Sequence, residues 1–123
     1  MGKSRLEGKV ALITGGARGM GASEAQLFID EGARVVISDV LDSVGQETAK
    51  RLSPNGSKCV FLHHDVTSED DWNAVVASVL ETFGQIDILV NNAESLNVVQ
   101  YLIQRFPHLL AQWTSMSPAY SSE

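Results

Sequence analysis

Residues 9–21 read Lys9-Val-Ala-Leu-Ile-Thr-Gly-Gly-Ala-Arg-Gly-Met-Gly21, an apolar run followed at once by a glycine-rich segment. The unbroken apolar run is typical of a strand that is covered on both faces in a parallel sheet. Gly15, Gly19 and Gly21 lack Cβ atoms, so the backbone there can turn sharply and approach a ligand. A helix that begins near Met20 would then offer free N–H groups to a pyrophosphate. The stretch predicts a dinucleotide-binding cradle, with a purely structural tight turn as the alternative.

The composition argues against several classes of function. Nine Lys and Arg against fifteen Asp and Glu give a net charge of −6, which disfavours nucleic acid and anionic membrane surfaces as partners. No stretch reaches membrane-spanning length and residues 1–7 lack the apolar core of a signal peptide, so we expect a soluble, cytoplasmic protein. Cys59, the single cysteine, reads as a small core residue. His63 and His64 would point to opposite faces of a strand and His108 is remote, so we assign no metal.

Further apolar runs at residues 34–39, 58–63 and 86–91 alternate with helical patterns, and a polar motif follows each run. Asp39 ends the second run, Asp65-Val66 follows the third, and Asn91-Asn92-Ala93 follows the fourth. Together with Thr14-Gly-x-x-x-Gly-x-Gly21, these motifs resemble the short-chain dehydrogenase/reductase family, over a stretch from about Leu6 to Ala93. The resemblance implies an α/β fold, a Rossmann-type doubly wound parallel sheet that is incomplete here, with strand order 3-2-1-4.

Asp39 bears on the choice of cofactor. At this distance from a glycine turn, a carboxylate accepts hydrogen bonds from the adenosine ribose hydroxyls and repels a 2′-phosphate, so Asp39 favours NAD over NADP. Arg18 pulls the other way, because related NADP enzymes often carry a basic residue at that place. We weigh the direct repulsion at the ribose more heavily. The alternative interpretation of Asp39 is a turn residue before the next helix.

The resemblance also implies the rest of the cofactor site. In the family, the Asp-Val pair at Asp65 and Val66 lies against the adenine ring, with the carboxylate accepting from the exocyclic amine. Without the other motifs, Asp65 would be interpreted as a helix-approach residue. The Asn91-Asn92-Ala93 turn steadies the central sheet in the family and passes beside the nicotinamide ribose. The expected cofactor-binding residues are Gly15, Arg18, Gly19, Met20, Gly21, Asp39, Asp65, Val66, Asn92 and Ala93.

The chemistry of the family needs residues that this chain lacks. A Tyr with a Lys three or four residues later acts there as general acid/base, beside an orienting Ser, while hydride passes between NAD and an alcohol or ketone. Tyr101 and Tyr120 have no such lysine, and Lys58 is the last lysine in the chain. We therefore assign no catalytic residue and interpret residues 1–93 as the NAD-binding half domain of a truncated, inactive dehydrogenase.

An alcohol or ketone substrate would accordingly belong only to a full-length relative. The resemblance leans toward bacterial cyclic-alcohol and hydroxysteroid dehydrogenases. Two further functions stay open. One is a stand-alone nucleotide-binding module, for which the glycine turn and Asp39 suffice. The other is a non-catalytic interaction subunit whose tail docks on a complete homologue.

Residues 94–123 form a tail that departs from the family, beginning with Glu94 in place of glycine. Apolar residues between Val98 and Trp113 have the spacing of an amphipathic helix, but Pro107 would break it, and residues 115–123 read as a disordered terminus. Residues 86–91 would then form an open sheet edge. We therefore expect marginal stability and self-association through that edge.

The codons that can encode the tail are also compatible with a shifted reading frame. With one G restored before the Glu94 codon, the overlapping codons across Glu94-Ser95-Leu96 permit Gly-Ile-Ser, the family's continuation after Asn-Asn-Ala. The same frame across residues 112–123 and a following TGA stop permits Val-Asp-Val-Asn-Val-Thr-Ser-Val-Phe-Leu-Gly-Met, which resembles the family's fourth-helix segment. We therefore expect a frameshift at Ala93/Glu94. The alternatives are another exon or a genuinely new tail.

Overall fold

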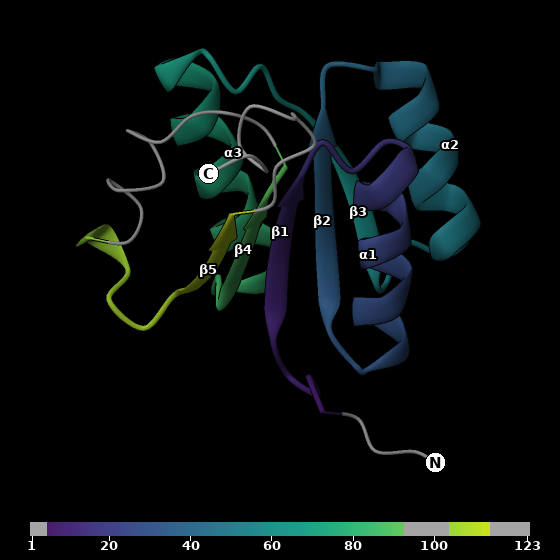
Figure 1. The fold of residues 1–123 in the computed structure, drawn as a ribbon, viewed down its shortest axis with the longest axis horizontal. Coiled ribbons are helices and arrows are strands. Elements are labelled where there is room, and N and C mark those ends of the chain that lie inside the picture. Colours follow the sequence, from purple (N-terminus) through teal and green to yellow (C-terminus); the bar gives the residue numbers. More distant parts are fainter. Residues whose placement is uncertain (1–4, 93–103, 114–123) are drawn as a thin grey trace, which may run out of the picture.

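The computed structural model describes residues 5–92 and 104–113, and strands alternate with helices as far as the fourth strand (Figure 1). The elements are β1 (Val10–Thr14), α1 (Gly19–Asp30), β2 (Arg34–Asp39), α2 (Asp42–Leu52), β3 (Cys59–His63), α3 (Glu69–Phe83), β4 (Ile88–Asn91) and β5 (Leu110–Trp113). This alternation confirms the predicted α/β class. α1 begins at Gly19, one residue before the predicted start.

The strands form one parallel sheet with the order β3-β2-β1-β4-β5. The order of the first four strands confirms the predicted 3-2-1-4 arrangement. Thr14, the last residue of β1, is in register with Ser38 of β2 and with Asn91 of β4. The carboxyl ends of the three central strands therefore meet at one edge, where open α/β sheets bind their ligands.

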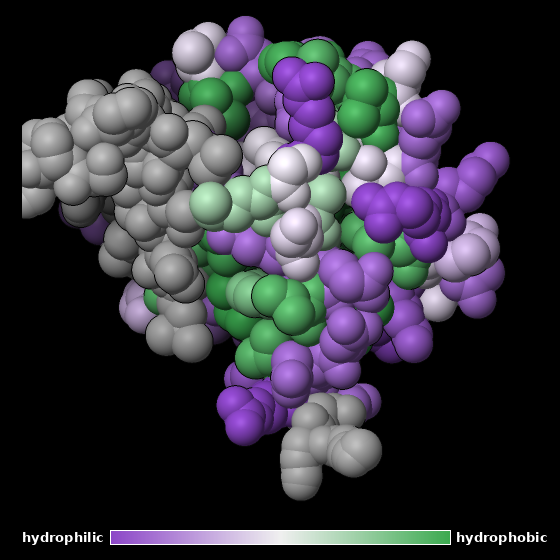
Figure 2. Space-filling model, turned by 45° about the vertical axis from the view of Figure 1, so that its right-hand side comes forward, coloured by the Kyte–Doolittle hydropathy of each residue, from purple (hydrophilic) through white to green (hydrophobic). Residues whose placement is uncertain are grey.

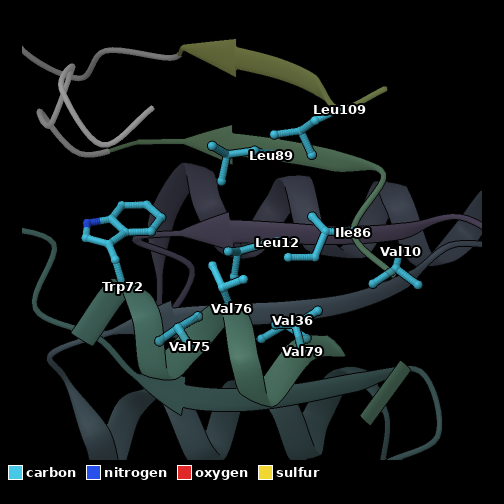
Figure 3. Close-up of a cluster of buried hydrophobic side chains, with 10 residues drawn as sticks. All are labelled: Val10, Leu12, Val36, Trp72, Val75, Val76, Val79, Ile86, Leu89 and Leu109. Carbon is cyan, nitrogen blue, oxygen red and sulfur yellow. The ribbon is translucent and has the colours of Figure 1, made fainter. Parts of the chain in front are cut away.

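Helices cover both faces of the sheet, with α1 and α2 on one side and α3 on the other (Figure 1). Alternate residues of β1 serve the two sides: Leu12 packs toward Val76 of α3, and Ile13 belongs to the cluster that contains Ala25 of α1. Figure 3 shows the α3 side, where the side chains of three strands meet those of α3. Full burial of each large aliphatic side chain contributes roughly 1.5–3 kcal/mol to folding.

Both ends of α3 are determined by local capping residues. The Asp71 N–H donates to the Ser68 Oγ across 3.1 Å, so Ser68 caps the helix. Three carboxylates in the first turn lie at the positive end of the helix dipole. Gly84 ends the helix in the left-handed region, at φ +83°, which a side chain rarely adopts.

The tail corrects the prediction that β4 forms the edge of the sheet. β5 pairs with β4 in parallel, from Ile88 opposite Leu110 to Asn91 opposite Trp113, and takes up backbone groups that β4 would otherwise leave open. The β4 side chains are also covered, since Ile88 and Val90 are 8% and 2% exposed. The expectation of an open edge at residues 86–91 is therefore wrong.

The segment before β5 docks the tail onto the domain. Gln104 and Arg105 are helical, and the chain turns at Pro107 and His108, where the sequence predicts a break. The His108 Nε2 lies 3.0 Å from the Ile86 carbonyl oxygen, and Leu109 is buried beside Leu89 (Figure 3). Residues 110–113, which the sequence assigned to the tail helix, form a strand instead. The part of the predicted helix before residue 104 and the terminus at residues 115–123 lie outside the described residues.

Candidate functional site

The glycine turn between β1 and α1 has a shape that side chains would prevent. Gly15 and Gly19 adopt φ values of +66° and +64°, in the left-handed region. A Cβ atom on Gly21 would overlap the carbonyl oxygen of Gly15 and the Cα of Gly16. The start of α1 therefore packs directly on the backbone of the turn.

The first turn of α1 leaves its N–H groups available. The N-cap residue, Arg18, is extended, and within the described chain no side chain caps this helix end. The first turn also contains no acidic residue. Free N–H groups and the positive end of the helix dipole together attract an anion such as a phosphate.

Asp39 is held at the same edge by three backbone N–H groups. Its Oδ2 accepts from the Ala17 N–H at 3.2 Å, inside the glycine turn. Its Oδ1 accepts from the N–H groups of Val40 and Leu41 at 2.7 and 3.3 Å. The carboxylate is thereby fixed beside the turn, where a ligand with hydroxyl groups would find an acceptor.

The end of β4 is joined to β1 and α1 by a set of side-chain hydrogen bonds. The Thr14 hydroxyl donates to the Asn91 Oδ1 at 2.8 Å and accepts from the Asn92 N–H at 3.0 Å. The Asn92 Nδ2 donates to the Thr14 carbonyl at 3.0 Å and to the Glu24 Oε1 at 2.9 Å. Glu24 was not among the predicted site residues, because its partner is remote in the sequence.

One cavity brings most of the predicted residues together. It has a volume of about 330 Å³ and is lined by Gly15, Arg18, Gly19, Met20, Gly21, Asp39, Leu41 and Asn92. Seven of these are predicted cofactor-binding residues, and Leu41 is an addition. Ala93 lies outside the described residues.

The outer surface around this cavity is partly apolar. Met20 and Val40 are 43% and 53% exposed, and Leu27 and Val44 are exposed along the groove between α1 and α2. On the face that Figure 2 shows, patches of hydrophobic residues lie among hydrophilic ones.

Asp65 and Val66 do not line this cavity but lie beside it, after β3. The backbone joins the two places, because the His64 N–H donates to the Asp39 carbonyl at 2.9 Å. The Asp65 Oδ1 accepts from the Thr67 N–H at 2.9 Å and from the Thr67 hydroxyl at 2.6 Å. These bonds lower the pKa of Asp65, so it is a carboxylate at neutral pH.

His63 and His64 point to opposite faces, as the sequence predicts. His64 is 1% exposed, its Nδ1 lies 2.8 Å from the Ser38 Oγ, and its ring meets that of Trp72 edge to face at 4.2 Å. Burial lowers the pKa of His64 to about 4. His63 is exposed and bonds to the Asp42 Oδ1 at 2.7 Å, which raises its pKa.

Across residues 5–92 and 104–113, no group of three or more His, Cys, Asp or Glu side chains could hold a metal ion. Cys59 is buried, as predicted, and burial raises the pKa of its thiol to about 11. No helix in the described part of the chain is long and apolar enough to cross a membrane. Tyr101 and Tyr120 lie outside the described residues.

Known proteins resemble this chain in sequence. A family model described as short chain dehydrogenase matches residues 9–105. Zerumbone synthase from Zingiber zerumbet is 54% identical over 89 residues, which cover 72% of this chain and 33% of that protein. The 3-beta-hydroxysteroid dehydrogenase from Comamonas testosteroni is 47% identical over 90 residues, covering 73% of this chain and 34% of that protein.

Solved structures resemble it in fold. A hydroxysteroid dehydrogenase from Escherichia coli superposes with a TM-score of 0.69 at 35% identity, over 75% of this chain and 39% of that chain. The present chain thus spans about a third of the length of the known relatives it matches.

Proposed function

Since this chain belongs to the short-chain dehydrogenase family, an oxidoreductase family, we propose that it binds NAD through the adenosine and pyrophosphate portion of the cofactor. The observation that carries the proposal is the cavity in which the glycine turn, the start of α1 and the Asp39 carboxylate meet. A pyrophosphate would accept from the N–H groups at the start of α1, which no side chain caps within the described residues. The ribose hydroxyls would donate to Asp39.

The same carboxylate supports NAD rather than NADP. Two unit charges about 4 Å apart repel by roughly 1 kcal/mol in water and by about 4 kcal/mol near a protein surface. A 2′-phosphate beside Asp39 would meet this repulsion. Arg18 opposes this repulsion weakly, because its side chain is exposed and solvent screens its charge.

The adenine ring finds complementary groups after β3. Within the described residues, no hydrogen bond uses the Asp65 Oδ2 or the Val66 N–H. The first is an acceptor for the exocyclic amine of adenine, and the second is a donor for a ring nitrogen. Asp65 and Val66 therefore form the adenine end of the proposed site.

We propose binding without turnover for this chain. The relatives that it matches are named as dehydrogenases, reductases and synthases, but it spans a third of their length. Neither tyrosine has the following lysine that general acid/base catalysis in the family requires. Oxidoreduction of an alcohol or ketone would belong to a longer relative.

The proposal is tested by titrating the chain with NAD and with NADP in a calorimeter. We expect NAD to bind at least about fivefold more tightly, from the repulsion at Asp39. The variant Asp39→Ala should weaken NAD binding and narrow the preference, and Asp42→Ala, which removes a nearby exposed carboxylate, is the control. Tighter binding of NADP by the unmutated chain would refute the assignment.

A further inference from the structure

Trp72 lies where the core of the domain meets the loops of the ligand edge. It belongs to the first turn of α3 and is 2% exposed. Figure 3 shows its ring at the end of the core cluster toward which the strands point, with the ring nitrogen directed away from Leu12 and Val76. A buried indole N–H needs a partner, and this one reaches out of the apolar cluster to find it.

Its partner is the loop that follows β3. The Trp72 Nε1 donates to the Val66 carbonyl oxygen at 2.9 Å. The preceding residue, Asp71, accepts the Asp65 N–H on its Oδ2 at 2.8 Å. The first turn of α3 thus occupies one backbone group of Asp65 and one of Val66.

Two hydrogen-bonding groups of Asp65 and Val66, one acceptor and one donor, are used by no hydrogen bond within the described residues. Asp65 keeps an acceptor, its Oδ2, and Val66 keeps a donor, its N–H, whereas the Asp65 N–H and the Val66 carbonyl are already used. Adenine offers an amine donor beside a ring-nitrogen acceptor, which complements this pair. Hypoxanthine offers a carbonyl acceptor beside an N–H donor, which opposes it at both positions.

We propose that Trp72 and Asp71 are positioning residues that set the base specificity of the nucleotide site. The inference rests on the proposed binding of adenine beside Asp65 and Val66. By occupying the Val66 carbonyl and the Asp65 N–H, the two side chains hold the loop in one arrangement and remove the groups that hypoxanthine would use. Without them, the loop can present either pattern.

A purely structural role for Trp72 makes a different prediction. A buried indole also stabilises the core, so its replacement lowers stability whatever the loop does. Loss of stability weakens the binding of all dinucleotides alike. A change in the ratio of two affinities, for ligands that differ only in the base, therefore separates the two roles.

The experiment measures the dissociation constants of NAD and of nicotinamide hypoxanthine dinucleotide by calorimetry. The unmutated chain should favour NAD by about tenfold, the ratio expected for a mismatched hydrogen-bonding pair. Trp72→Phe keeps a buried ring but loses the N–H, and should reduce the ratio to about twofold. Asp71→Ala, which does not disturb the core cluster, should reduce it in the same direction. Val76→Ala, on the core face of the same helix, is the control and should keep the ratio.

Each outcome decides one claim. If the unmutated chain binds neither dinucleotide, the proposed function fails and this inference falls with it. If the chain binds NAD but both Trp72→Phe and Asp71→Ala keep the tenfold ratio, the proposed function stands and the positioning role is wrong. The positioning role is also wrong if Val76→Ala lowers the ratio as much as Trp72→Phe does.

Discussion

The Nδ2 of Asn92, at the end of β4, donates to the Oε1 of Glu24 in α1 across 2.9 Å, although 68 residues separate the two in the sequence. The same amide donates to the carbonyl of Thr14, the last residue of β1. β1, β4 and α1 are therefore tied together where the glycine turn begins. A flipped amide would set its oxygen against the Thr14 carbonyl and the Glu24 carboxylate, so only the observed orientation satisfies both acceptors.

Removal of the Glu24 carboxylate should loosen this junction. We expect Glu24→Ala to lower the free energy of unfolding by about 1–2 kcal/mol, because the half-buried Asn92 amide loses a charged acceptor. Glu24→Gln keeps an acceptor oxygen and should retain most of that stability. Urea unfolding of the three proteins measures the difference, and equal losses in both variants would show that the hydrogen bond does not hold the junction.

His64 should make the domain sensitive to mild acid. Its pKa is about 4 in the folded protein and 6.5 in an unfolded chain, so the unfolded state binds the proton more readily between these values. The stability associated with neutral His64 is complete above pH 6.5 and is lost as the pH falls toward 4. The loss should amount to roughly 2–3 kcal/mol.

Urea unfolding between pH 7 and pH 4.5 measures this loss, and the variant His64→Gln should flatten the pH profile over that range. His63→Gln is the matched control, from the adjacent position. The pKa of His63 is raised by Asp42, so this pair adds stability at low pH and loses it as the pH rises through the folded pKa. If His63→Gln flattens the pH profile more than His64→Gln does, the acid sensitivity does not come from His64.

Leu109 tests whether the tail is docked as a fifth strand. It is 8% exposed in the core cluster just before β5, so Leu109→Ala should cost about 2–3 kcal/mol of unfolding free energy. Leu27→Ala, at a position that is 61% exposed, should cost much less. Thermal and urea unfolding provide the comparison. Equal, small effects at the two positions would mean that β5 does not pack on β4 in solution.

The elements up to β4 could be predicted because each is encoded locally. β1 is an unbroken apolar run, and the glycine positions of the following turn are demanded by its backbone angles and close packing. The opposite directions of His63 and His64 follow from the alternation of a strand. Strand order came from the family resemblance, since apolar runs alone do not say which strands pair.

The remaining features depend on contacts between distant residues. β5 forms beside β4 because backbone groups are open there, whereas the tail pattern alone favoured a helix broken at Pro107. The partner of Glu24 lies 68 positions away, just after β4, and the Trp72 indole bonds to the loop before its own helix, a contact that helical spacing does not predict. Such roles become visible only when the elements are packed together.

The coding DNA tests the origin of the tail. We expect the frame that restores Gly-Ile-Ser after Ala93 to continue beyond codon 123 into a Ser, and then into a Tyr with a Lys close behind it. We expect this because the overlapping codons of residues 94–96 and 112–123 permit an amino-acid sequence that resembles the family. A neighbouring frame without that order of residues would mean that the tail arose in another way.

If NAD lies in the cavity formed by the glycine turn and Asp39, its binding should change the surroundings of the backbone at those residues. NMR measures this when the backbone amide signals of the isotope-labelled chain are followed as NAD is added. We predict that the amides of Gly15, Gly19 and Asp39 shift, while those of Gly56 and Gly84, which lie in a distant turn and at the end of α3, stay in place. If the amide signals of Gly15, Gly19 and Asp39 do not move, or if no signal moves at saturating NAD, then NAD does not bind in this cavity.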